Sequence, residues 1–416
     1  MSKKQKKPMR YKTVRRLRGI LIGFEVLFGL IVLLAGTVYF VPSFRNQAIK
    51  AMAGTNAGRT VIGWFSKNDY ETNVQDKDFE EDKIVVNNIR KADLEKYTEI
   101  LLIGIDARGD EMDDSTNSDS MIVLHIDNDT GEVKMLSVYR DTLLEIIGAD
   151  GQSLGYRAKV NSAYSREGVQ ACINTLNTNL DLHIKDYVVL NFTGVTKIID
   201  ELGGIDVTLN QDEVYQLNEH LADTKLNTGL YAPNIKKPGK NHLVGLQATT
   251  YMRIRKAEYQ DEETGEIIRD DYGRAARQQS VIKKLIKKVK EAGLQSTLNM
   301  VDIVLSSNTE KERILKTSMS FDEIMSLVPT LFDFKLAGGQ GFPTARVGID
   351  TEEYGDALVP QGLEYNVLQM HQFLYGNNND YEVSDVVKNI DLSIQQDTGV
   401  TPLDTSNVSQ TSTSGQ

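Results

Sequence analysis

The chain has 416 residues, which is enough for one large domain or two domains of ordinary size. Its apolar content of 40% and charged content of 25% are those of a globular protein, and its formal net charge is −11. This acidic balance argues against a general nucleic-acid binder, and the single cysteine excludes an intrachain disulfide. The five histidines are scattered, and no His/Cys cluster has the spacing of zinc ligands.

The N-terminal region is first basic and then apolar. Residues 1–18 hold nine Lys/Arg and no acid, and residues 19–41 are apolar except for Glu25. Such a run can span a bilayer, and the positive charge before it predicts a cytoplasmic N-terminus. A cleaved signal peptide is the alternative, but the run is long for one and no A-x-A site follows it. We therefore expect a single-pass cell-membrane protein whose main domain is extracellular.

Residues 42–97 are polar and acid-rich, which indicates a stem between the membrane and the main domain. From Thr98 the pattern changes. The runs "EILLIGI" and "SMIVLHI" are typical of strands buried on both faces. The turn "NDTG" and the run "EVKMLSVY" then predict a hairpin over Ser120–Tyr139.

Helices and strands alternate over the rest of the chain. This alternation predicts an α/β fold in which helices cover a mixed central β-sheet, preceded by a single transmembrane helix. We assign the main domain to residues 98–380, and we expect the Ser/Thr-rich residues 381–416 to be disordered. Helices are predicted at 166–181, 193–204, from Gly245, at Asp271–Ala292, 321–334 and 363–376, and further strands at 186–192 and 205–209.

Two carboxylates lie at the ends of the first two strands. Asp106 ends the first strand and Asp119 precedes the second. If the strands are adjacent, both acids lie at one rim of the sheet, where α/β folds place ligands. Two such carboxylates repel each other unless a cation lies between them, and oxygen ligands without His or Cys suit Mg²⁺. From the residues alone, plain loop-solvating and capping acids are an equally open interpretation.

Cationic residues follow in three places. Arg140 and Asp141 end the third strand near the same rim, and Arg253 and Arg255 share one side of an extended stretch. Buried arginines need a partner, and a phosphate at a helix N-terminus is a natural one. A structural salt bridge is the alternative for each arginine taken alone. The third place is the helix that starts at Asp271. Its apolar stripe consists of Val281, Ile282, Leu285 and Val289. Arg274 and Gln278 lie in line with this stripe, and Arg277 lies at its margin.

The chemistry that these groups suggest is phosphoryl transfer or pyrophosphate binding. Several short motifs in a fixed order make the chain resemble the LytR–CpsA–Psr family from Thr98 to Gly293, with weaker likeness beyond. A basic tail with one membrane anchor is also the layout of that family. The motifs are "LLIGID" with Arg108, "SDSM", "SVYRDT", "KVNSAY", "DYVVLNFTGVTKIIDELGGIDV", "HLVGLQATTYMRIR" and "DYGRAARQQ".

The resemblance implies a cell-envelope phosphotransferase that moves an anionic or capsular glycopolymer from a polyprenyl-pyrophosphate carrier to peptidoglycan, with the carrier tail in an apolar tunnel. It implies Mg²⁺, or Mn²⁺, held by Asp106 and Asp119. Asp141 and Asp271 would orient arginines or assist proton transfer, and Arg140 and Arg274 would act with them in catalysis. The residues implied at the pyrophosphate are Arg108, Arg140, Arg253, Arg255, Arg274, Arg277 and Gln278.

The chain also departs from the family pattern. The family usually has an arginine where this sequence has Asn117, a proline where it has Tyr139, and a double glycine where it has Glu167–Gly168. Two other functions use the same residues: a regulator of the transcription-attenuator type that binds polyprenyl phosphates without turnover, and a hydrolase of the polyprenyl pyrophosphate. The absence of a DNA-binding motif and the outward topology count against the regulator.

Overall fold

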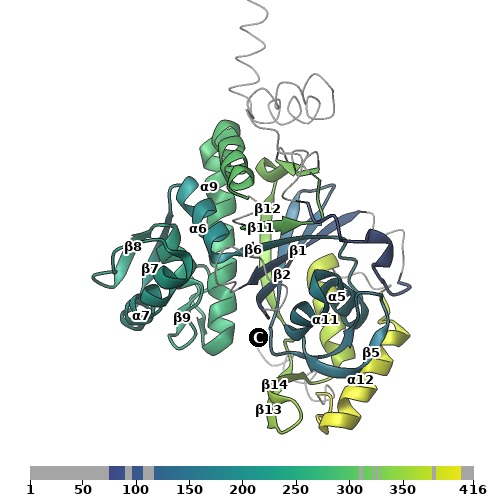
Figure 1. Ribbon diagram of the computed structural model, residues 1–416. Coiled ribbons are helices and arrows are strands. Elements are labelled where there is room, and N and C mark those ends of the chain that lie inside the picture. The colour runs from purple at the N-terminus through teal and green to yellow at the C-terminus, as the bar shows by residue number, and fades with distance from the viewer. Residues whose placement is uncertain are drawn as a thin grey trace, which may run out of the picture. The chain divides into compact units, whose positions relative to one another are not determined.

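The structure, a computed structural model, describes residues 75–89, 96–105, 117–308, 313–320, 323–324, 327–328, 330–376 and 381–403 (Figure 1). The predicted basic tail, the predicted membrane span and most of the predicted stem lie outside these residues, and so do Asp106 and Arg108. Within the described part of the chain, no helix combines the length and the apolar character needed to cross a membrane.

A six-stranded mixed sheet forms the centre of the fold, with the strand order β11-β6-β1-β2-β3-β12. β1 (Tyr97–Ile105) pairs antiparallel with β2 (Ser118–Asp127), and β2 and β3 (Glu132–Val138) form the predicted hairpin. β6 (Asp186–Asn191) lies parallel to β1. The outer strands are β11 (Leu315–Thr317), antiparallel to β6, and β12 (Lys335–Phe342), parallel to β3. The mixed sheet that the sequence predicts is therefore confirmed.

The two faces of the sheet differ in how fully they are covered. Side chains alternate along a strand, so Leu101 of β1 faces the main hydrophobic core, which α5 (Ser162–Leu180) and α11 (Leu363–Tyr375) complete. On the other face Leu102 and Leu190 are only half-buried. Figure 1 shows α5 and α11 on one side of the sheet and α6 and α9 on the other. An incompletely covered apolar face is where an apolar ligand can bind.

The elements after β6 build the wall opposite this half-covered face. The long helix α9 starts at Asp270, and its backbone is non-helical at Gly293 (φ 78°), next to the predicted helix end at Ala292. A capping box between Asn210 and Glu213 starts α7. The elements are α6 (Phe192–Glu201), β7 (Ile205–Leu209), α7 (Gln211–Thr228), β8 (Gly239–Leu243), α8 (Gly245–Tyr251), β9 (Tyr259–Gln260), β10 (Ile267–Ile268) and α9 (Asp270–Ser307).

Several elements were not predicted, among them α7 and the strands β8 to β12. Two further unpredicted hairpins, β4–β5 and β13–β14, lie outside the central sheet. An isolated bridge between Thr142 and Leu358 links the segment before β4 to the second hairpin. Their bounds are β4 (Leu143–Ile147), β5 (Ser153–Lys159), β13 (Arg346–Thr351) and β14 (Gly355–Pro360), and short 3-10 helices lie at Glu81–Lys83 and Thr330–Phe332.

The expectation that residues 381–416 are disordered is wrong for the segment that forms α12 (Asp385–Thr398). Val387, Ile390 and Ile394 recur at helical spacing and are buried in the main core. Asp391 of α12 accepts hydrogen bonds from the backbone nitrogens of Leu363 (2.8 Å) and Glu364 (3.3 Å), at the start of α11. The folded domain therefore extends past the predicted boundary at residue 380.

We expect Asp391→Ala to lower the free energy of unfolding by about 1–2 kcal/mol, because two backbone N–H groups at the start of α11 lose their acceptor. Urea denaturation followed by circular dichroism measures the change. Asp385→Ala is the matched control, since the Asp385 side chain is 96% exposed and its removal should change stability by less than about 0.5 kcal/mol. Equal stability of the two variants would contradict the role assigned to Asp391.

Candidate active site

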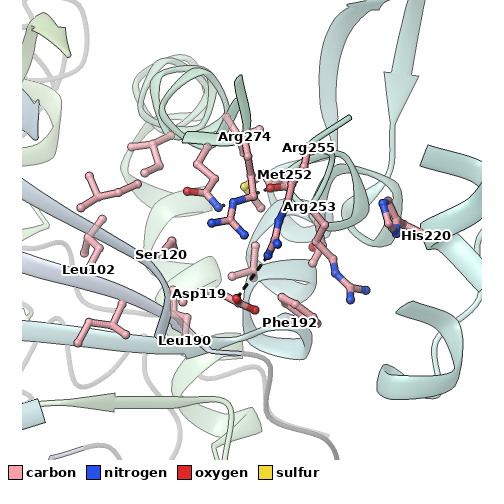
Figure 2. Close-up of a pocket in the computed structure, with 18 of the residues that line it drawn as sticks. Leu102, Asp119, Ser120, Leu190, Phe192, His220, Met252, Arg253, Arg255 and Arg274 are labelled. Carbon is pink, nitrogen blue, oxygen red and sulfur yellow. Dashed lines mark hydrogen bonds and ion pairs between the residues drawn. The ribbon is translucent and has the colours of Figure 1, made fainter. Parts of the chain in front are cut away.

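A pocket of about 700 Å³ lies between the half-covered face of the sheet and helices α6, α8 and α9 (Figure 2). Most of its wall is apolar, and charged and polar groups gather where β2, α8 and α9 approach one another. The apolar part includes Leu102, Ile122, Val188, Leu190, Val195, Ile198, Ile282 and Leu285, and the polar part includes Asp119, Arg253, Arg255, Arg274 and Gln278.

A β-bulge places Asp119 at the pocket. β1 and β2 pair Gly104 with Ser120 and Ile105 with Ser118, so Asp119 is an extra residue with no partner in β1. Bulges of this kind redirect a side chain, and Asp119 lines the pocket. Gly104 pairs with the neighbouring Ser120, and a Cβ at Gly104 would lie 2.5 Å from the Ser120 Oγ. β1 and β2 are antiparallel, so the start of β2, where Asp119 lies, is next to the end of β1.

Arg274 is the most buried cation of the pocket, with a side chain that is 6% exposed. Its Nη2 donates to Asp271 Oδ2 at 2.9 Å, and Asp271 Oδ1 also lies 3.5 Å from Arg255 Nε. Burial lowers the pKa of Arg274 to about 10, and the neighbouring Asp271 opposes this shift. Arg274 is therefore charged at neutral pH, and its guanidinium is incompletely solvated, which favours an anionic ligand.

The ion pairs continue from Arg255 to the end of β3. Arg255 Nη2 lies 3.9 Å from Asp119 Oδ1, to which Arg140 Nη1 donates at 2.9 Å. Arg140 Nε in turn donates to Asp141 Oδ2 at 3.4 Å. Figure 2 shows Arg255 and Asp119 joined across the pocket. We call the resulting set of six alternating charges the charge network; its members are Asp119, Arg140, Asp141, Arg255, Asp271 and Arg274.

Arg253 and Gln278 also line the pocket but lie outside this network. Arg253 donates to Thr224 Oγ1 (2.7 Å) and Asp223 Oδ2 (3.0 Å) of α7 and lies over the Phe192 ring. Gln278 Nε2 is 3.5 Å from the Met252 carbonyl. Figure 2 shows Arg253 directed away from Asp119. Of the predicted arginines that the structure describes, Arg140, Arg255 and Arg274 converge, whereas Arg253 lies apart from them beside α7.

Some pocket residues were not found by sequence reasoning. His220, Glu219 and Asp223 belong to α7, which the sequence analysis did not identify, and they line the pocket beside Arg253. Burial lowers the pKa of His220, and the positive charge of Arg253 adds to this effect. The capping-box pattern at Asn210 and Glu213 was the signal that could have revealed α7.

The structure does not place Arg277, which was predicted at the pyrophosphate site, at the pocket. Its side chain is 0% exposed, and its Nη2 and Nε donate to Glu213 Oε1 at 2.8 and 3.0 Å. Nη1 donates to the carbonyl of Ile254, and Nη2 also donates to the carbonyls of Ala257 and Glu258. These contacts use the donors of Arg277 inside the core between α7 and α9, away from the pocket.

The pocket contains one of the two carboxylates that were predicted to hold Mg²⁺. Of the two predicted ligands, only Asp119 falls within the described residues, and among those residues no group of three or more His, Cys, Asp or Glu could hold a metal. Mg²⁺ commonly uses one or two protein carboxylates together with phosphate oxygens of a substrate. Asp119, at a pocket with cationic groups for phosphates, fits that arrangement, and Mg²⁺ remains a prediction.

The fold and the site together define a class of protein. A pocket with cations at one end and a long apolar wall suits a ligand with an anionic head and a hydrocarbon body, and a pyrophosphate head matches several converging arginines. The family model of the LytR_cpsA_psr family matches residues 62–331. The chain belongs to this family, as its motifs predict.

Named relatives match the chain over part of their length. Biofilm regulatory protein A of Streptococcus mutans is 34% identical over 198 residues, which are 47% of this chain and 45% of the relative. The polyisoprenyl-teichoic acid–peptidoglycan teichoic acid transferase TagU of Bacillus cereus is 32% identical over 55% of this chain and 62% of its own length. TagV of Bacillus subtilis, a transferase of the same description, is 31% identical over 50% and 48%. The chain thus spans about half the length of these relatives.

Solved structures share the fold. A crystal structure from Streptococcus agalactiae covers 72% of this chain and 93% of its own, with 24% identity and a TM-score of 0.54. TagT bound to LIIa-WTA covers 70% and 96%, with 23% identity and a TM-score of 0.51. At these identities the likeness shows the mixed α/β architecture and nothing finer.

Proposed function

We propose that this protein is a membrane-anchored phosphotransferase that attaches an anionic or capsular glycopolymer from a polyprenyl-pyrophosphate carrier to peptidoglycan. The observation that carries the proposal is the charge network beside an apolar pocket wall. The names of TagU and TagV as teichoic acid–peptidoglycan transferases support it. The apolar segment 19–41 is proposed as the anchor, with the N-terminus in the cytoplasm and the catalytic domain outside.

In this proposal the pyrophosphate head binds at Arg140, Arg255 and Arg274, and the polyprenyl tail lies along the apolar wall. The arginines hold the non-bridging oxygens and stabilise the charge that develops on them in the transition state. Asp119 would hold Mg²⁺, which would neutralise part of the same charge. Asp271 keeps the Arg274 guanidinium in place through the bond at 2.9 Å.

The proposed reaction breaks a phosphoanhydride bond and forms a phosphoester bond. The hydroxyl oxygen of a peptidoglycan sugar bonds to the phosphorus that carries the glycopolymer, and the bond from that phosphorus to the polyprenyl phosphate breaks. The hydroxyl proton passes to a carboxylate, for which Asp141 is the candidate because it ends the charge network beside Arg140. The leaving group is polyprenyl phosphate, and a phosphodiester joins the two polymers.

A regulator without turnover is the second candidate, and the name of the Streptococcus mutans relative favours it. A single assay separates the alternatives. The full chain in detergent is incubated with a polyprenyl-pyrophosphate saccharide, Mg²⁺ and peptidoglycan oligomers, and the products are identified by mass spectrometry. A phosphodiester-linked saccharide supports transfer, phosphosaccharide alone supports hydrolysis, and binding without product supports the regulator. Omission of Mg²⁺ in the same assay tests the metal requirement.

We expect Leu285→Glu to weaken binding of octaprenyl pyrophosphate about 100-fold. The substitution puts a carboxylate in the apolar wall of the pocket, and binding of the hydrocarbon tail would remove water from that carboxylate at a cost in free energy. Binding of inorganic pyrophosphate should change much less, since it has no tail. Titration calorimetry with both ligands measures the difference. Lys287→Glu is the matched control, because it introduces the same residue on α9 at a side chain that is 75% exposed. Equal losses for the two ligands would contradict a tail site at this wall.

A further inference from the structure

A second pocket, of about 380 Å³, adjoins the first at the charge network. Asp119 lines the first pocket, and its ion-pair partner Arg140 lines the second together with Asp141. The remaining wall comes from the end of β5, the start of α5 and the turn between β13 and β14. We call it the basic pocket and define it by the cations Arg140, Arg157, Lys159 and Arg166.

Arg166 is the cation of the basic pocket that has no carboxylate partner among the described residues. The other three are paired: Arg140 with Asp119 and Asp141, Arg157 with Asp397, and Lys159 with Asp141, whose Oδ1 lies 3.7 Å from Lys159 Nζ. The Arg166 side chain is exposed and stacks over the Tyr156 ring at 4.9 Å. Its positive charge therefore remains available for an anion.

Arg157 adds an unused donor to the same wall. Its guanidinium pairs with Asp397 of α12, but its Nε is buried and has no hydrogen-bond partner in the described part of the chain. Buried N–H groups without a partner are uncommon in folded proteins.

Asn117 lies in the same pocket. Its Oδ1 accepts a hydrogen bond from Ser165 Oγ at 2.6 Å, which ties it to the first turns of α5. That part of α5 precedes a kink at Glu167 and Gly168 (φ 71° at Gly168) and carries Arg166. The cations of this pocket come from the end of β3, from β5 and from α5.

The location of the basic pocket indicates which substrate it serves. If the donor pyrophosphate and its tail occupy the first pocket, the acceptor hydroxyl must approach the same phosphorus from the side opposite the leaving group. The basic pocket reaches the charge network at Arg140 and Asp141, the candidate proton acceptor. A neutral glycan needs no cluster of cations, whereas the peptide stems of peptidoglycan carry carboxylates.

We propose that the basic pocket binds a carboxylate of the peptide stem of the peptidoglycan acceptor, through Lys159, Arg157 and Arg166, and so brings a sugar hydroxyl to Asp141. This inference rests on the proposed transferase function and adds a site for its second substrate. The acceptor peptide, not only the acceptor sugar, then contributes to recognition.

The test uses the full chain in detergent and two probes: a disaccharide-tetrapeptide fragment of peptidoglycan with free carboxylates, and the same fragment with its carboxylates amidated. We expect Arg166→Ala to weaken binding of the free-carboxylate fragment about tenfold and Arg166→Lys to retain part of it. The amidated fragment should bind weakly to wild type and to both variants. Lys287→Ala is the matched control for loss of one exposed positive charge and should change neither affinity.

Three results would overturn the proposal: equal affinity of wild type for the two fragments, no detectable binding of the free-carboxylate fragment, or a loss in Arg166→Ala that affects octaprenyl pyrophosphate instead of the fragment. The last result would assign the pocket to the donor. Failure of the transferase function gives a different pattern. Wild type would then form no linked product, while its affinity for the free-carboxylate fragment would still depend on charge and on Arg166.

Discussion

Replacement of Arg274 by alanine is expected to reduce glycopolymer transfer at least about 1,000-fold, as for other arginines that stabilise a transferring phosphoryl group. Arg274 is the most buried cation of the pocket, and its guanidinium is charged at neutral pH because its pKa is about 10. An incompletely solvated charge stabilises an anion more strongly than an exposed one. The rate is measured as formation of the linked product under saturating acceptor.

The matched control for this variant is Arg269→Ala. Arg269 precedes the same helix, but its side chain is 64% exposed and pairs only with Glu258 among the described residues. The control variant should transfer the glycopolymer at nearly the wild-type rate, and both variants should retain the wild-type circular dichroism spectrum.

Arg140→Ala should lose as much transfer activity as Arg274→Ala, because the Arg140 side chain joins Asp119 and Asp141 in the charge network. Wild-type rates in both Arg140→Ala and Arg274→Ala would refute the proposed site.

Arg274→Lys separates charge from geometry in the same experiment. Lysine keeps the positive charge but lacks the planar fork that binds two phosphate oxygens at once. We expect it to recover only part of the lost rate, with a larger effect on kcat than on KM because the fork acts most strongly in the transition state. Full recovery would indicate that only charge is required at this position.

The parts of the fold that the sequence predicts best are those with strong local patterns. The continuous apolar runs of β1 and β2 and the turn before β3 identify three central strands. α12 was missed because its buried residues, Val387, Ile390 and Ile394, are few and lie among polar ones. The hairpin β13–β14 was also missed, because buried and exposed residues do not alternate regularly along its two strands.

The candidate site was predictable where helical geometry alone places a side chain. The stripe of α9 puts Arg274 and Gln278 on the face that lines the pocket, as the structure has them. Arg277 lies at the margin of that stripe, and the direction of its side chain depends on Glu213, which is 64 positions away in the sequence. A contact of that sequence separation leaves no local pattern, and Glu213 lies on a helix that the sequence analysis did not identify. Structural and phosphate-binding arginines therefore looked alike in the sequence.

The two roles of arginine in α9 can be separated by experiment. We expect Glu213→Ala to lower the free energy of unfolding by about 3–5 kcal/mol, because it leaves the fully buried Arg277 guanidinium without its carboxylate. The Glu213 carboxylate also accepts from the backbone nitrogen of Asn210 at the start of α7, which adds to the loss. Urea denaturation of wild type and variant measures the change.

Arg277→Met is the informative companion, since methionine fills much of the volume but provides no donors. It should be destabilised by a similar amount, because Glu213 and the carbonyls of Ala257 and Glu258 all lose their partner. Below the unfolding transition, however, its affinity for octaprenyl pyrophosphate should stay within about twofold of wild type, in contrast to Arg274→Ala. A loss of pyrophosphate affinity as large as that of Arg274→Ala would show that Arg277 reaches the ligand after all and would restore the role that the sequence suggested.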